Sequence, residues 1–182
     1  MSATPSHTLA AIRFAPEFHI EAVLDETVQA LRGHGLRIAG VVQREKPETN
    51  GCCPVTFLED VATGRRLQIS QALGSGSRGC RLDPQALAGV CGDLIATVES
   101  GVDLLVLNRF GKGEADGHGF RAVIERALDR NVPVLTAVRD TYAADFEAFA
   151  GGMADILQPH ADAAVQWSRL ATGVTPAQDS AA

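Results

Sequence analysis

Residues 101–114 read GVDLLVLNRFGKGE, and this stretch decides the fold. Five of the six residues at 102–107 are apolar, and a glycine directly precedes them. A short apolar run of this kind is typical of a strand that is buried on both faces of a parallel sheet. The run ends at Asn108 and Arg109, where a polar loop with two glycines begins. Ligands in open α/β sheets bind beyond the carboxyl ends of the strands, so residues 108–114 are the first candidate site.

Strands and helices alternate along the rest of the chain. Short apolar runs predict further strands at residues 8–13, 36–43, 132–138 and 154–157. Apolar residues at helical spacing predict helices at residues 17–32, 84–100, 119–130, 142–149 and 162–170. The first two strands flank a helix, which predicts a right-handed βαβ unit. Residues 55–70 hold two alternating segments around a Thr-Gly turn, which predicts an antiparallel hairpin at one edge of the sheet.

The size and charge of the chain restrict its function. The 182 residues predict a single α/β domain over 1–170, followed by a disordered tail over 171–182. The net charge of −6 argues against non-specific binding to nucleic acid or to an anionic membrane. The N-terminus lacks the basic start of a secretory signal, and no apolar run approaches the roughly 20 residues that cross a bilayer. We therefore expect a cytoplasmic protein with no membrane span.

The four cysteines form no CxxC pair, so the sequence predicts no structural zinc site. Cys91 falls within a predicted helix and is expected to be a core residue. The adjacent Cys52 and Cys53 are either reduced loop cysteines or a redox-active or soft-metal pair. Cys80, between Arg78 and Arg81, is either structural or a thiol of lowered pKa. We predict neither a metal nor a cofactor.

The loop after the first strand lacks the features of a phosphate-binding loop. The Walker pattern GxxxxGK[ST] requires glycines, so that amides can wrap the phosphates, and a lysine to neutralise them. Residues 13–19 read RFAPEFH, in which Pro16 lacks an amide hydrogen and Glu17 is negative. Asn108 stands where such enzymes place a magnesium-binding aspartate, and asparagine carries no charge. The sequence therefore argues against a nucleotide-hydrolysing enzyme.

Two short motifs nevertheless carry a resemblance to known proteins. The run NRFGK at 108–112 with Glu114, and the hairpin with Asp60 and Thr63-Gly64, resemble a P-loop nucleoside-triphosphatase family whose strand ends in Asp-Glu-Ile-Gly-Lys. The runs GCRLD at 79–83 and NRFGK are similar to those of an uncharacterised bacterial family without the Walker lysine. Members of that family are often labelled molybdenum-transport ATP-binding proteins. The resemblance implies a P-loop-like three-layer sandwich with a degenerate nucleotide site, and it makes a tetrahedral oxyanion such as molybdate a candidate ligand.

Cationic side chains gather near the predicted carboxyl ends of the strands. Arg13, Arg109, Lys112 and Arg139 follow strands, and arginine gives forked hydrogen bonds to oxyanions. The glycine-rich run at 73–83 offers backbone amides that can form an anion nest. The predicted ligand-binding set is Ser75, Ser77, Arg78, Arg81, Asn108, Arg109 and Lys112. Alternatively, the arginines pair with local carboxylates, for instance Arg139 with Asp140 or Arg109 with Glu114.

Three hypotheses follow. The first is a binding protein for a small anion, either a molybdate-like oxyanion or a phosphate-bearing ligand, that does not hydrolyse it. The second is a divergent nucleoside triphosphatase that uses Lys112 and positions water with Glu114. The third is an interaction module whose hairpin edge pairs with a partner or with a second copy, giving a homo-oligomer such as a dimer.

Overall fold

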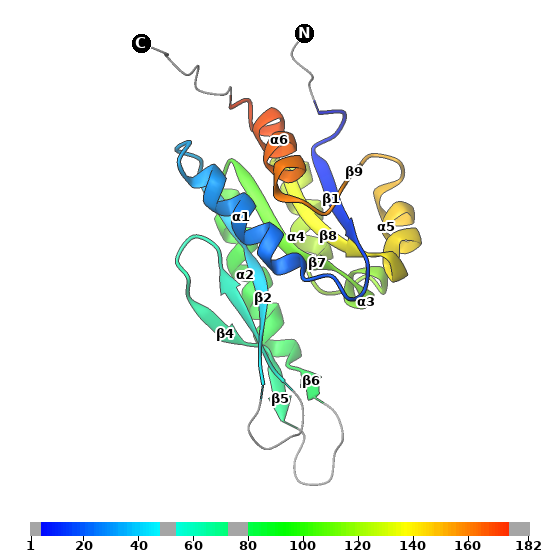
Figure 1. The fold of residues 1–182 in the computed structure, drawn as a ribbon. Helices are drawn as coiled ribbons and strands as arrows, with labels where there is room; N and C mark the ends of the chain where they lie inside the picture. The colour runs from blue at the N-terminus through cyan, green and yellow to red at the C-terminus, as the bar shows by residue number, and fades with distance from the viewer. Residues whose placement is uncertain (1–4, 48–53, 73–79, 175–182) are drawn as a thin grey trace.

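A computed structural model of the chain describes residues 5–47, 54–72 and 80–174. Its central sheet has seven strands: β1 (Leu9–Phe14), β2 (Ile38–Lys46), β3 (Val55–Asp60), β4 (Arg66–Gln68), β7 (Leu104–Phe110), β8 (Val134–Arg139) and β9 (Asp155–Leu157). Their spatial order is β4-β3-β2-β7-β8-β1-β9. Strands β2, β7, β8, β1 and β9 are parallel, whereas β3 and β4 are antiparallel to their neighbours (Figure 1). The predicted α/β class and the antiparallel hairpin at one edge are confirmed.

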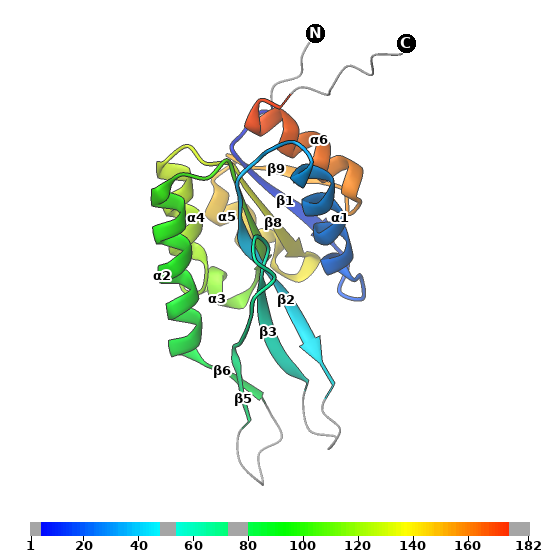
Figure 2. The ribbon, with the colours of Figure 1, turned by 90° about the vertical axis from the view of Figure 1, so that its left-hand side faces the viewer.

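Helices cover both faces of the sheet (Figure 2). Helices α1 (Ile20–Arg32) and α6 (Ala161–Thr172) lie on one face, and α2 (Pro84–Ser100), α4 (Arg121–Asp129) and α5 (Ala143–Ala150) lie on the other. Each face has its own buried cluster, because side chains alternate across each strand. Leu104 and Val106 pack with the α1 and α6 residues, while Leu105 and Leu107 pack with those of α2, α4 and α5. The protein is therefore a three-layer sandwich.

Strand β7 is buried as predicted but longer than predicted. The side chains of residues 104–107 are at most 1 % exposed. The strand continues through Asn108 to Phe110, with a register shift against β8 between Leu107 and Phe110. The ring of Phe110 lies 5.2 Å from that of Phe146 and 5.4 Å from that of Phe149, centroid to centroid. This aromatic packing holds the end of the strand in the sheet beyond the polar pair.

A local capping signal fixes helix α2. The carboxylate of Asp83 accepts hydrogen bonds from the amides of Gln85 and Ala86, and Pro84 occupies the first helical position. The helix prediction over 84–100 is confirmed. The structure differs just upstream, where residues predicted as part of a glycine-rich loop form strand β6 (Cys80–Leu82) and pair with β5 (Ser70–Ala72). Within the described residues, no helix combines the length and the hydropathy that a membrane crossing requires.

The chain order of the strands creates a switch point. Strands β1 and β2 are not neighbours as in a simple βαβ unit, because β8 and β7 lie between them. The connection from β1 through α1 therefore leads one way along the sheet, and the connection from β8 through α5 leads the other way to β9. Ligands in such sheets bind at the carboxyl edge near the point where the direction reverses. The loops after β1 and β8 meet at that edge.

Candidate functional site

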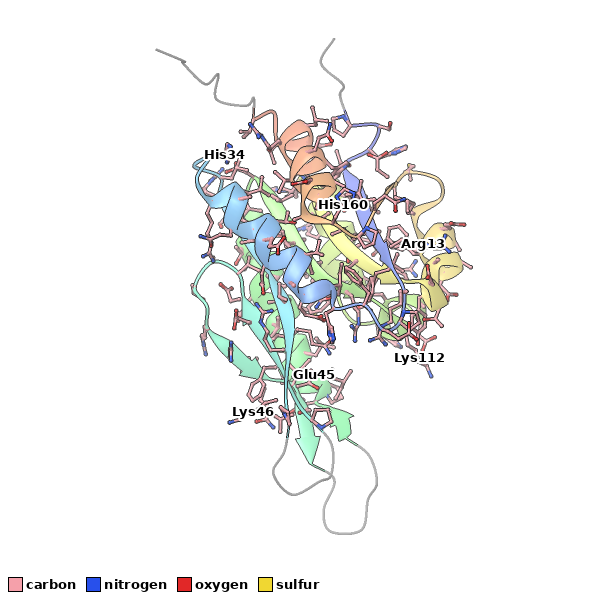
Figure 3. All side chains as sticks on the ribbon, in the orientation of Figure 1. Arg13, His34, Glu45, Lys46, Lys112 and His160 are labelled. Atoms are coloured by element: carbon pink, nitrogen blue, oxygen red, sulfur yellow. The ribbon has the colours of Figure 1, made fainter. Side chains whose placement is uncertain are left out.

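An open cleft of about 500 Å³ lies at the carboxyl edge of the sheet. Its walls come from the loop after β1, the start of α1, the outer half of β2 and the ends of β7 and β8. Figure 3 labels Glu45 on the β2 wall. The lining residues are Pro16, Glu17, Phe18, His19, Glu21, Gln43, Arg44, Glu45, Arg109 and Arg139.

The cleft exists because two neighbouring strands part. The pairing of β2 with β7 covers Ile38 to Val41 and ends there, opposite Leu107. Beyond Val41, β2 continues to Lys46 with β3 as its neighbour. The end of β7, with Arg109, is thus separated from the outer half of β2, and polar side chains of both strands face the space between them.

Arg109 is a half-buried cation with a loose partner. Its side chain is 21 % exposed, and its Nη1 lies 3.7 Å from Oε1 of Glu21, too far for a hydrogen bond. Burial lowers the pKa of Arg109, and the positive charge of Arg139 lowers it further, although Glu21 and two other glutamates act in the opposite direction. An arginine stays protonated at neutral pH, so this lowered pKa marks a cation in an unfavourable environment.

Arg139 supplies the second cation. Its Nε is buried and has no hydrogen-bond partner among the described residues. A buried donor without an acceptor typically costs about 1–3 kcal/mol. Asp140 does not relieve this, because its Oδ1 accepts a hydrogen bond of 2.6 Å from Nε of Arg13. Arg109 and Arg139 line the same cleft, close enough for the charge of one to act on the other, and in the described part of the chain neither is hydrogen-bonded to a carboxylate.

Arg44 lines the same cleft but is fully engaged. Its Nη1 and Nη2 donate to the two carboxylate oxygens of Asp25 at 2.9 and 2.7 Å, and Nη2 also donates to Glu59 at 3.0 Å. These carboxylates raise the pKa of Arg44, chiefly through the hydrogen bonds with Asp25. Arg44 is accordingly part of the wall rather than a free cation.

Asn108 lies beneath the cleft and is 1 % exposed. Its Nδ2 donates to Oε1 of Glu21 at 3.2 Å, the oxygen that also lies nearest to Arg109. Its own Oδ1 is buried without a hydrogen-bond donor in the described part of the chain. Asn108 therefore holds Glu21 beside Arg109 instead of reaching the cleft itself.

Lys112 and Glu114 do not line the cleft. Lys112 is exposed at the start of α3 (Lys112–Ala115), away from the cleft lining (Figure 3). Glu114 is buried, and its two carboxylate oxygens accept hydrogen bonds from the amides of Gly111 at 3.0 Å and Phe120 at 2.8 Å. A Cβ atom on Gly119 would come within 2.2 Å of Oε1 of Glu114. Glu114 thus holds the connection between β7 and α4 in place. The carboxylate that forms an ion pair with Arg109 is that of Glu21, and not that of Glu114 as the sequence suggested.

The remaining sequence-predicted site residues fall wholly or in part outside the described part of the structure. Ser75, Ser77 and Arg78 lie outside the described residues, as do Cys52 and Cys53. The backbone of Arg81 belongs to β6, and its side chain and that of Cys80 are outside the described part as well.

Sequence reasoning missed several cleft residues. Arg139 was recognised as a cation at a strand end but was left out of the ligand set, although the rule that selected Arg109 applies to it equally. Glu21 and Glu45 were missed because they belong to a helix and to an extended strand arm, for which no motif signals a site.

Cys91 is half-buried as a core cysteine would be, and burial raises the pKa of its thiol to about 11.

Comparison with known proteins places the chain in a family. The model of a family described as "Protein of unknown function (DUF2478)" matches residues 9–167. The chain belongs to this family. This DUF2478 member is also 36 % identical, over 149 residues, to a protein of Bradyrhizobium diazoefficiens named "Molybdenum import ATP-binding protein ModC 2". The matched region is 82 % of this chain but only 17 % of that relative. No solved structure matches.

Proposed function

We propose that the cleft binds a small anion, either a molybdate-like tetrahedral oxyanion or a phosphate-bearing ligand, and does not hydrolyse it. The observation that carries the proposal is the pair formed by Arg109 and Arg139. Both are partly buried in one cleft, and among residues 5–47, 54–72 and 80–174 neither is hydrogen-bonded to a carboxylate. An oxyanion between them would neutralise their repulsion and accept from the buried Nε of Arg139.

The start of helix α1 adds to this environment. His19 occupies the N-cap position without accepting a side-chain hydrogen bond within the described residues. The first-turn amides of a helix carry partial positive charge and favour a nearby anion. Because His19 and Glu21 line the cleft, this helix end faces the same space as the two arginines.

The loop between β1 and α1 supports binding without hydrolysis. It contains neither glycine nor lysine, and Pro16 and Glu17 stand where a phosphate-binding loop needs amides and positive charge. The relative's name mentions both molybdenum and ATP, so both kinds of ligand belong in the test. The proposal includes a P-loop-like origin for the parallel core, because the strand-helix order and the NRFGK motif resemble that fold.

A thermal-shift panel tests the proposal. Molybdate, tungstate, sulfate, phosphate, ATP and GTP are each added with and without magnesium. A ligand at 100 times its dissociation constant should raise the free energy of unfolding by about 2.7 kcal/mol. We expect at least one oxyanion to raise the melting temperature, and Arg109→Ala to remove the shift while leaving the unliganded melting temperature nearly unchanged. Arg13→Ala is the matched control, since Arg13 lies at the same edge but outside the cleft.

Two results would contradict the proposal. A shift that requires both nucleotide and magnesium, together with phosphate release, would favour a divergent nucleoside triphosphatase. No shift with any compound would favour the interaction module, and the hairpin edge would then be the surface to test.

A further inference from the structure

We propose that the ligand of this cleft donates a hydrogen bond as well as accepting several, so that the cleft selects an oxyanion that keeps an O–H group at neutral pH. Hydrogen phosphate has this chemistry, whereas sulfate and molybdate have only acceptor oxygens. This inference rests on the proposed function, and it narrows the ligand class of the same site.

The first support is the balance of charge around the cleft. Three arginines line it, namely Arg44, Arg109 and Arg139, and so do three glutamates, namely Glu17, Glu21 and Glu45. Arg44 is already held by Asp25 and Glu59. The cations that remain for a ligand are therefore accompanied by carboxylates, and a fully deprotonated dianion meets repulsion as well as attraction.

The second support is the position of Glu21. The Nδ2 of Asn108 fixes Oε1 of Glu21 on the wall, 3.7 Å from Nη1 of Arg109. An anion that binds Nη1 of Arg109 therefore places an oxygen close to this carboxylate. An oxygen without hydrogen is repelled there, whereas an O–H group donates to the carboxylate in a short, charge-assisted hydrogen bond.

The cleft also offers carboxylate acceptors to a ligand. Glu17, Glu21 and Glu45 line the cleft, and an ionised carboxylate can only accept hydrogen bonds. The carboxylates of the cleft are thus arranged to receive hydrogen-bond donors. A site built to accept from a ligand hydroxyl rejects the analogue that lacks it, because a polar group of the site is then left unpaired.

Isothermal titration calorimetry at pH 7 tests the inference with phosphate, arsenate, sulfate and molybdate. Phosphate and arsenate keep an O–H group at this pH, and sulfate and molybdate do not, so the comparison separates protonation from size. We expect the two protonated anions to bind at least tenfold more tightly than the other two.

Two variants test which carboxylate of the cleft distinguishes the protonated anions from the unprotonated ones. In Glu21→Gln and in Glu45→Gln the acceptor carboxylate is replaced by an amide that also donates, so we expect sulfate and molybdate to bind more tightly and the phosphate preference to shrink severalfold. Because Glu21 also contacts Asn108 and Arg109, the exposed Glu45 provides the variant that is less able to disturb the wall. Glu26→Gln, on the exposed side of α1, is the matched control and should keep the wild-type preference.

The outcomes separate the two proposals. If sulfate or molybdate binds as tightly as phosphate, or if neither glutamine variant changes the preference, the present inference is wrong while anion binding at Arg109 stands. If no anion binds, or if Arg109→Ala leaves binding unchanged, the proposed function itself is wrong.

Discussion

Arg44 and Arg109 line one cleft with side chains of equal exposure, 21 % each, yet their surroundings are opposite. Arg44 donates three hydrogen bonds to Asp25 and Glu59, and these carboxylates raise its pKa. Within the described residues Arg109 has a single ion pair, with Glu21 at 3.7 Å, and burial together with Arg139 lowers the pKa of Arg109. The first arginine completes the wall, and the second is left available.

The difference shows that burial by itself does not identify a functional charge. A half-buried arginine with two carboxylate partners stabilises the fold, because removing Arg44 leaves Asp25 without its partner and Glu59 with Arg66 alone. A half-buried arginine beside another cation adds little to the folded state, which favours the proposed role in binding. The two residues therefore make opposite predictions for stability and for affinity.

The largest expected effect on stability belongs to Arg44→Met. Two carboxylates would lose their shared partner, and we expect a loss of about 1–2 kcal/mol, below the range for fully buried pairs because the side chain of Asp25 is half exposed. Arg109→Met should change the free energy of unfolding by less than about 0.5 kcal/mol, since it removes a repulsion as well as a loose ion pair. Urea denaturation of both variants measures the contrast. Equal losses of unfolding free energy in Arg44→Met and Arg109→Met would contradict the contrast between the two arginines.

A smaller effect on the free energy of unfolding is expected at acidic pH, and it tests the ion pair between Arg44 and Glu59. Hydrogen bonds from Arg44 and then Arg66 lower the pKa of Glu59 in the folded protein, against the effect of burial. A carboxyl whose folded pKa is lowered stabilises the fold above its unfolded pKa, and this contribution is lost as the pH falls through the folded value. The free energy of unfolding should therefore decline below about pH 4.5, the ordinary value for this group.

The measurement is the unfolding free energy from pH 7 down to pH 3. Glu59→Gln should be less stable at neutral pH and should show a shallower decline, whereas Glu26→Gln should follow the wild type. An unchanged acid profile in Glu59→Gln would mean that Arg44 owes its position to Asp25 alone.

The smallest effect is expected for Arg13→Gln. Its ion pair with Asp140 is about half exposed on both sides, and water and salt screen such pairs. We expect a melting temperature indistinguishable from wild type at 0.5 M salt and only a slight decrease at low salt. A large loss would mean that the Arg13–Asp140 pair supports the loops around the switch point.

Local sequence signals predicted most of the fold. The periodicity of apolar residues identified the buried strands, and the Asp83-Pro84 cap gave the exact start of α2. The end of β7 was placed too early because the partners of Phe110 are Phe146 and Phe149, which lie in a later helix. Contacts between distant segments leave no local pattern.

The candidate site was only partly predictable for the same reason. The rule about strand ends pointed to Arg109, and it also applied to Arg139. Which arginine remains available depends on partners from other elements, such as Asp25 for Arg44 and Glu21 for Arg109. Lys112 looked equivalent to Arg109 in sequence, but the short helix that begins there carries it away from the cleft.

The carboxylate that joins the amides of Gly111 and Phe120 has a consequence for the mechanism of binding. It fixes the connection that follows Arg109 before any ligand arrives, and Gly119 leaves that carboxylate its place. If Arg109 binds a ligand as proposed, a β7 end that is fixed in this way loses little conformational entropy on binding. Association should then be a single kinetic step, with an observed rate that rises linearly with ligand concentration.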